Sequence, residues 1–229
     1  METEIAFILL SAVSMSFVLL AYLQGQIWLV GVTASLLVLA NVIGPKVVSV
    51  FGFAITAGTP LFASLPLATD LLTEKYGRNA AKQAVYVAFF GMLFFAAISY
   101  FVLNMQVLPF AQQAGDAVDT IFAASIRLMI ASPVAYLVWQ MVDISLYHHI
   151  LKRTGESKLW LRNNISTFVA QAGSTISFFF LGFYGTETPW LNIALVTIIF
   201  YWIVAAADTA IIYWCRSVEP RDLKISHDK

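Results

Sequence analysis

Four acidic residues lie within or at the end of apolar segments that otherwise carry few charges. Asp70 and Glu74 close a segment that runs from Thr59 with no earlier charge, and Asp143 and Asp208 lie late in two later apolar segments. Asp70 and Glu74 are four residues apart, so on a helix they share one face. A carboxylate is costly in lipid and should face protein or water. It can accept hydrogen bonds from two parallel N–H groups of a polar ligand.

Three of these acids are expected at a similar depth. Asp70 precedes Lys75 by five residues, Asp143 precedes Lys152 by nine, and Asp208 precedes Arg216 by eight. At the helical rise these spacings place the carboxylates about 7–14 Å inside a basic edge. The pattern predicts a shared polar interior. The alternative is that each acid pairs with a nearby loop cation or caps a broken helix.

Other polar residues could complete a binding site. Gln140 lies one turn before Asp143, so both can face one cavity. Asn164 belongs to a polar helix start, where capping is the alternative role, and Gln171 continues that polar side deeper. Arg127 could bind a ligand or extend to the headgroups. The candidate substrate-binding residues are Asp143, Gln140, Asn164, Asp70, Glu74, Arg127, Gln171 and Asp208.

No motif of an enzyme or of a metal centre accompanies these residues. The sequence has no phosphate-binding loop, zinc motif or nucleophile elbow. The adjacent His148 and His149 point to different faces of a helix and make a poor metal pair. We therefore expect no catalytic activity, no metal and no cofactor.

The composition is that of a membrane protein. Of 229 residues, 60% are hydrophobic and 11% charged, and the mean hydropathy is +0.80. A soluble domain could not bury so much apolar surface. The net charge of zero argues against a nucleic-acid partner. Cys215 is the only cysteine, so the chain cannot form an intrachain disulfide.

The predicted fold is all-α: a polytopic bundle of about seven transmembrane helices forming one domain over residues 1–229. Gly52 and its β-branched and aromatic neighbours predict a short extracellular hairpin or re-entrant segment near 47–58. Residues 105–119 are expected to form a polar loop. The expected spans are 5–24, 27–46, 59–76, 80–104, 120–151, 163–184 and 190–215.

The basic residues predict the orientation of the bundle. All except Lys46 and Arg127 fall between the third and fourth spans, between the fifth and sixth, or after the seventh. Seven alternating spans bring these three clusters to one side, which should be the cytoplasm. We therefore expect a multi-pass protein of the cell inner membrane with its N-terminus outside and its C-terminus in the cytoplasm.

Three ordered segments resemble the queuosine precursor transporter family, also called the vitamin uptake transporter family. They are the segments 69–77, 127–136 followed by Gln140 and Asp143, and 160–167 continuing to Gln171 and Thr175. The similarity covers about residues 40–215, so the span at 5–24 is additional. The chain departs from the family pattern at Ser174, where aspartate is frequent, and near Trp202, where lysine is frequent.

The resemblance implies an importer of 7-deazaguanine bases for the salvage of tRNA queuosine. The ligand would be a planar 7-deazapurine, with Asp143 as first acceptor and Gln140 and Asn164 binding its other polar atoms. One alternative is a substrate-binding subunit of a multi-component vitamin or nucleobase uptake system. Another is a non-transporting membrane assembly factor, which would tolerate neutralisation of all three buried aspartates.

Overall fold

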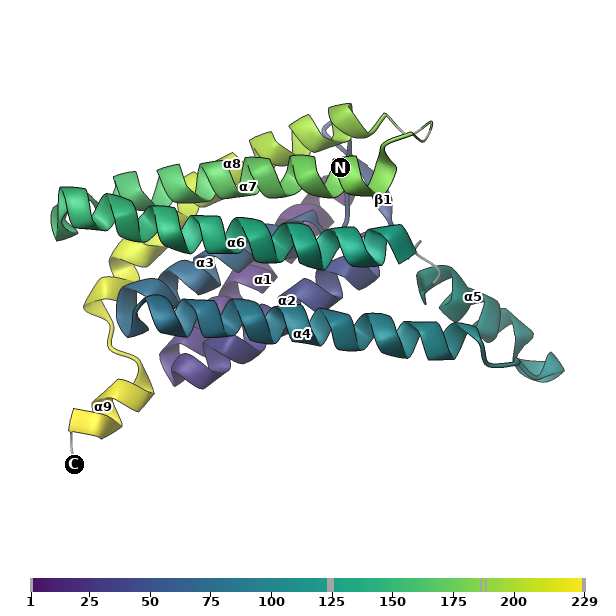
Figure 1. The fold of residues 1–229 in the computed structure, drawn as a ribbon, viewed down its shortest axis with the longest axis horizontal. Helices are drawn as coiled ribbons and strands as arrows, with labels where there is room; N and C mark the ends of the chain where they lie inside the picture. Colours follow the sequence, from purple (N-terminus) through teal and green to yellow (C-terminus); the bar gives the residue numbers. More distant parts are fainter. Residues whose placement is uncertain (1, 123–125, 186, 188, 228–229) are drawn as a thin grey trace.

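The computed structural model describes residues 2–122, 126–185, 187 and 189–227. Long helices dominate this part of the chain and lie side by side in a bundle (Figure 1). They are α1 (Glu2–Gln24), α2 (Gln26–Ile43), α3 (Thr59–Tyr76), α4 (Arg78–Leu103), α6 (Ile126–Thr154), α7 (Leu159–Phe183) and α8 (Trp190–Ser217). Shorter elements are α5 (Gln112–Phe122), α9 (Arg221–His227) and the 3₁₀ turns Pro109–Ala111 and Glu156–Lys158.

Among the described residues, five helices have both the length and the hydropathy to cross a membrane: α1, α2, α4, α7 and the segment containing α8. Their outer faces expose large apolar side chains, among them Phe17, Trp28, Phe94 and Ile203. In water such faces would be unfavourable, whereas lipid accommodates them. The chain is therefore an all-α membrane bundle.

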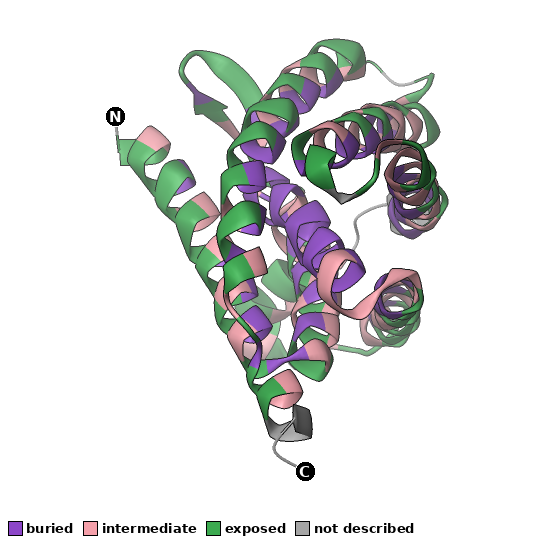
Figure 2. Cartoon of the chain, turned by 90° about the vertical axis from the view of Figure 1, so that its left-hand side faces the viewer, coloured by how far each residue is buried: buried purple, intermediate pink, exposed green. Residues whose placement is uncertain are grey.

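Helix α3 is the centre of the bundle. It contacts α1, α2, α4, α6 and α8, and 14 of its 18 residues are buried. Figure 2 shows a helix in the middle of the bundle buried along most of its length, while its neighbours expose their outer faces. Because α3 is surrounded by protein, its polar residues meet protein groups. This position explains why α3 lacks the hydropathy of a lipid-facing span although it is as long as α2.

A β-hairpin joins α2 to α3. Strand β1 (Val47–Val50) pairs antiparallel with β2 (Phe53–Thr56), with Val50 opposite Phe53. The two turn residues, Phe51 and Gly52, have φ values of 50° and 82°. Positive φ at both positions is typical of a type I′ turn, whose twist matches that of the strands. Val50 and Ile55 pack against Phe7, so the hairpin lies beside the start of α1.

The region 105–119 corrects the expectation of a polar loop. It contains a 3₁₀ turn and most of α5, which ends at Phe122, and α6 begins only at Ile126. The side chain of Gln112 donates to Asp116 at 2.9 Å, one turn away. The expected single span at 120–151 is therefore wrong, because it combined the last residues of α5 with most of α6. Polar residues marked this segment as a loop, although an amphipathic surface helix can have the same composition.

Candidate functional site

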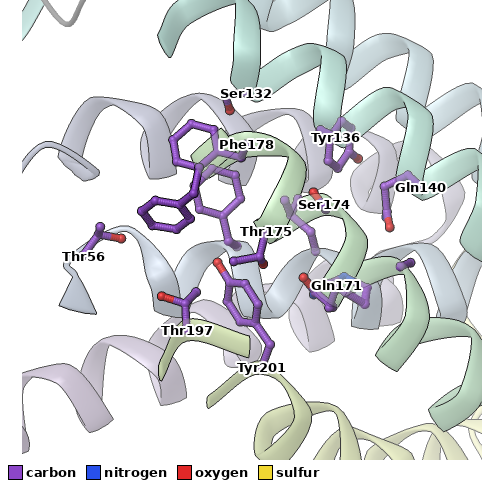
Figure 3. A pocket seen from close by; sticks show the side chains of 15 residues that line it. Thr56, Ser132, Tyr136, Gln140, Gln171, Ser174, Thr175, Phe178, Thr197 and Tyr201 are labelled. Carbon is purple, nitrogen blue, oxygen red and sulfur yellow. The ribbon is translucent and has the colours of Figure 1, made fainter. Parts of the chain in front are cut away.

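A cavity of about 70 Å³ lies inside the bundle, and we call it the polar cavity for the hydroxyl and amide groups in its otherwise mainly apolar wall. Its walls come from β2, α3, α6, α7 and α8. The lining side chains carry no formal charge, so binding inside the cavity would depend on hydrogen bonds and aromatic contacts. The polar and aromatic members are Thr56, Phe62, Ser132, Tyr136, Gln140, Gln171, Ser174, Thr175, Phe178, Phe179, Thr197 and Tyr201 (Figure 3).

Two hydroxyl groups in the cavity wall are buried without a partner. Tyr136, on α6, is 5% exposed and Thr197, on α8, is 4% exposed. Within the described part of the chain neither hydroxyl has a hydrogen-bond partner. The Gln140 side chain lies close enough to the Tyr136 hydroxyl to interact with it, while its amide nitrogen donates to Thr69 Oγ1 at 3.2 Å. Buried polar groups are normally satisfied, so these two mark a place where a polar ligand or water completes the structure.

A larger, mostly apolar cavity of about 380 Å³ adjoins the polar one towards the hairpin. Thr56, Phe62, Phe178 and Phe179 line both cavities, so three aromatic side chains separate them. Other walls of this apolar cavity come from the end of α2, from α4 and from the end of α5.

Asp70, Asp143 and Asp208 form a layer beyond the polar cavity. We call these three residues the acid layer. They are 4%, 1% and 2% exposed, respectively, and Asp143 and Asp208 both interact electrostatically with Asp70. Asp70 follows the lining residue Pro66 by four residues and Asp143 follows Gln140 by three. About one helical turn, 5.4 Å, therefore separates Asp70 and Asp143 from the cavity wall along their helices, whereas Asp208 follows the lining residue Tyr201 by seven residues, about two turns.

The acid layer has few hydrogen bonds. Thr167 Oγ1 donates to Asp70 at 3.4 Å. Neither carboxylate oxygen of Asp143 or of Asp208 has a hydrogen bond of ordinary length to another described residue, and the Ser166 side chain lies close enough to Asp143 to interact with its carboxylate. Such acids in a membrane bundle are typical of substrate or ion pathways.

Glu74 lies one turn beyond Asp70 and is the centre of an ion-pair cluster with Tyr147, Arg162 and Arg216. Arg162 Nη2 donates to the two Glu74 oxygens at 3.1 and 2.8 Å, and Arg216 Nε donates at 2.6 Å. The Tyr147 hydroxyl donates at 2.5 Å, and the Arg162 guanidinium lies 5.2 Å from the centre of the Tyr147 ring. This Glu74 cluster connects α3, α6, α7 and α8 on the side of the acid layer away from the cavity.

Hydrogen bonds from two side-chain amides connect the first turns of α7 to α8. The side chains of Asn163 and Asn164 donate to Thr209 Oγ1 at 3.2 and 2.8 Å. Asn164 also donates to the Trp160 carbonyl at 2.8 Å. The capping alternative is therefore wrong, because α7 begins at Leu159 without a side-chain cap and these amides donate to groups of α7 and α8 instead.

The structure places the eight predicted site residues in several groups. Gln140 and Gln171 line the polar cavity, while Asp70, Asp143 and Asp208 form the acid layer. Glu74 is engaged in its cluster and Asn164 in the α7–α8 contact. The side chain of Arg127 lies outside the described residues. Whether any of the eight binds substrate stays a prediction.

The cavity also contains residues outside the predicted set of eight. Thr197 is one hydroxyl within a long apolar helix, a weak local signal. Tyr136 and Tyr201 occur among aromatic residues that elsewhere face outwards, such as Tyr184, which is 60% exposed. Only the packing of α6 against α7 and of α7 against α8 shows which side chains share a cavity.

The arrangement has the chemistry of a small-molecule binding site. Amide and hydroxyl groups can hold the polar edge of a ligand, and Phe178, Phe179 and Tyr201 can contact its faces. In the described residues, no group of three or more histidine, cysteine, aspartate or glutamate side chains is arranged to hold a metal ion.

Comparisons with known proteins agree on one family. Residues 56–215 match the family model described as "Putative vitamin uptake transporter". The chain is 31% identical to the "Probable queuosine precursor transporter" of Bacillus subtilis over 82% of its own length and 83% of the relative's. It is 30% identical to the "Queuosine precursor transporter" of Escherichia coli over 65% of its own length and 66% of the relative's. No solved structure matches. The chain therefore belongs to the vitamin uptake transporter family.

Proposed function

We propose that this protein imports queuosine precursors, 7-deazaguanine bases, across the cell inner membrane for tRNA queuosine salvage. The observation that carries the proposal is the polar cavity, because its amides, hydroxyls and aromatic rings suit a planar base with polar edges. The names of the relatives supply the substrate.

The candidate residues take different roles in this proposal. Gln140 and Gln171 hold polar atoms of the base within the cavity. Asp143, one turn beyond Gln140, accepts paired N–H donors, because a carboxylate can accept two such bonds. The environment of Asp143 supports this role, since no hydrogen bond of ordinary length from another described residue occupies its oxygens.

The orientation belongs to the same proposal. Seven helices, α1, α2, α3, α4, α6, α7 and α8, cross the membrane. The hairpin and α5 lie outside, and the basic end with α9 lies in the cytoplasm. Along the bundle the order would then be the apolar cavity, the polar cavity, the acid layer and the Glu74 cluster. A precursor entering from outside would reach the Phe62–Phe178–Phe179 partition before the polar cavity.

The test uses a host that makes no queuosine precursor and contains no importer of its own. A low concentration of 7-deazaguanine precursor is supplied, and the queuosine content of tRNA is measured with and without the protein. We expect queuosine only in cells with the protein. No increase over the empty vector, with the protein present in the membrane, would contradict the proposal unless a co-purifying ATPase identified a missing subunit.

A pair of variants connects uptake to the cavity. Ser174→Trp places a large ring in the wall, whereas Ile176→Trp changes a residue of the same helix that is 45% exposed on the outer face. We expect Ser174→Trp to abolish uptake and Ile176→Trp to retain it. Equal uptake by both variants would exclude this cavity from the path.

A further inference from the structure

The two unpaired hydroxyls of the polar cavity suggest which residues give the site its selectivity. Tyr136 and Thr197 come from α6 and α8 and are separated in the view of Figure 3 by residues of α7. Removing a buried polar group from water without a hydrogen bond costs free energy. Two such hydroxyls in one cavity lower the stability of the fold. Groups of this kind are expected where they are needed to bind a ligand rather than to stabilise the protein.

We propose that the hydroxyls of Tyr136 and Thr197 bind the polar edge of the ligand and determine which bases the protein accepts. The inference rests on the proposed function and deepens it by naming the selective groups. A ligand that supplies partners satisfies both hydroxyls. A ligand of the same shape without such groups leaves them buried and unpaired, and sites of this kind reject such analogues strongly.

The other hydroxyls of the bundle provide a contrast. Thr33 is fully buried and donates to the Leu29 carbonyl at 2.7 Å, within its own helix. Tyr22 is also fully buried and donates to the carbonyls of Cys215 and Val218, both at 2.6 Å. These hydroxyls stabilise the fold through short bonds to backbone carbonyls, whereas those of Tyr136 and Thr197 make no hydrogen bond of ordinary length to another described residue.

The experiment therefore compares hydroxyl deletions at four positions. Tyr136→Phe and Thr197→Val remove the cavity hydroxyls with little change of shape. Tyr22→Phe and Thr33→Val are the matched controls. Binding of 7-deazaguanine, and of 7-deazapurine without its exocyclic groups, is measured on the purified full-length protein in detergent. The thermal midpoint of each variant is measured without ligand.

We expect the two pairs of variants to behave oppositely. Tyr136→Phe and Thr197→Val should each weaken binding of 7-deazaguanine about two- to thirteenfold, the scale of one hydrogen bond. They should also reduce the preference for 7-deazaguanine over 7-deazapurine, with an unchanged or higher thermal midpoint. Tyr22→Phe and Thr33→Val should lower the midpoint and leave the preference unchanged.

Each other outcome is decisive. Unchanged affinity and preference in both cavity variants would overturn the inference while leaving the importer intact. Binding by the wild-type protein without uptake in cells would overturn the importer, and the variants would still test the hydroxyls. If the wild-type protein bound neither base, the hydroxyls would not be groups that select a 7-deazapurine. A fall in midpoint of the cavity variants equal to that of the controls would show a structural role.

Discussion

At the scale of single residues, the buried acids divide into two kinds. Glu74 accepts hydrogen bonds from two arginines and a tyrosine, whereas Asp143 and Asp208 have no hydrogen bond of ordinary length to another described residue. Sequence spacing grouped Glu74 with Asp70, because residues four apart share a helix face. It could not show that one helical turn separates a fully paired carboxylate from an acid layer with few hydrogen bonds.

Asp143 provides the first prediction at this scale. Asp143→Asn keeps the size but replaces one acceptor with a donor, which mismatches the paired N–H groups of the proposed ligand. We expect normal insertion and a loss of binding above about 1.5 kcal/mol, the scale of a charge-assisted hydrogen bond. The measurement is binding of 7-deazaguanine together with the amount of protein in the membrane. The control is Asp116→Asn, at an exposed residue of α5. Wild-type affinity of Asp143→Asn would show that Asp143 does not bind the ligand. Loss of the variant from the membrane would show that Asp143 has a structural role.

Glu74 leads to a different expectation. In Glu74→Gln, Arg162 and Arg216 lose their carboxylate partner, and Arg162 is only 1% exposed. Breaking a buried ion pair costs about 3–5 kcal/mol. We expect a marked decrease in thermal stability and in the amount of folded protein. The exposed Glu2→Gln is the control, and a Glu74→Gln protein as stable as this control would show that the cluster contributes little to folding.

At the scale of the elements, hydropathy predicts the lipid-facing helices better than the enclosed ones. The five helices that pass the length and hydropathy criteria among the described residues all have apolar outer faces. Helix α3 was expected at 59–76, and it has these bounds in the structure. Its central place was not predictable, because it depends on contacts with five other helices. The amphipathic α5 was missed because a surface helix and a polar loop have similar composition.

The close contact between α6 and α7 depends on Gly173. A Cβ atom at Gly173 would lie 2.4 Å from three ring atoms of Trp139, and the Trp139 indole donates to Ser177 at 2.9 Å. Overpacking of this kind costs about 1–3 kcal/mol. We therefore expect Gly173→Ala to lower the thermal midpoint and to disturb the neighbouring cavity wall at Ser174.

The control for this helix contact is Gly31→Ala. Gly31 lies inside α2, and a Cβ atom there would meet no heavy atom within 4 Å. Alanine favours a helix over glycine by up to about 1 kcal/mol, so this variant should be neutral or slightly more stable. Equal midpoints for the two variants would indicate that Trp139 moves aside without cost.

At the scale of the whole molecule, loops and charges separate to the two ends of the bundle. The hairpin and α5 lie towards one end of the helices, and the α6–α7 connection and α9 lie towards the other (Figure 1). The latter end holds Lys75, Arg78, Lys152 and Arg216, at the starts and ends of the helices that meet there. The sequence predicted this grouping from loop charges alone, because the rule depends on chain order rather than on packing.

The orientation prediction is tested by labelling one residue from each end. Ala114, in α5, and Ser157, between α6 and α7, are both exposed. Cys215 is 1% exposed and should give little background. Because short cytoplasmic loops are enriched in lysine and arginine, we expect Ala114→Cys to react with a membrane-impermeant maleimide added to intact cells. Ser157→Cys should react only after the membrane is opened. Labelling of both residues from the same side would rule out seven alternating spans. If the two residues were labelled from opposite sides but Ser157→Cys reacted from outside, the seven spans would stand and the orientation would be inverted. The Glu74 cluster would then lie at the outer end of the bundle.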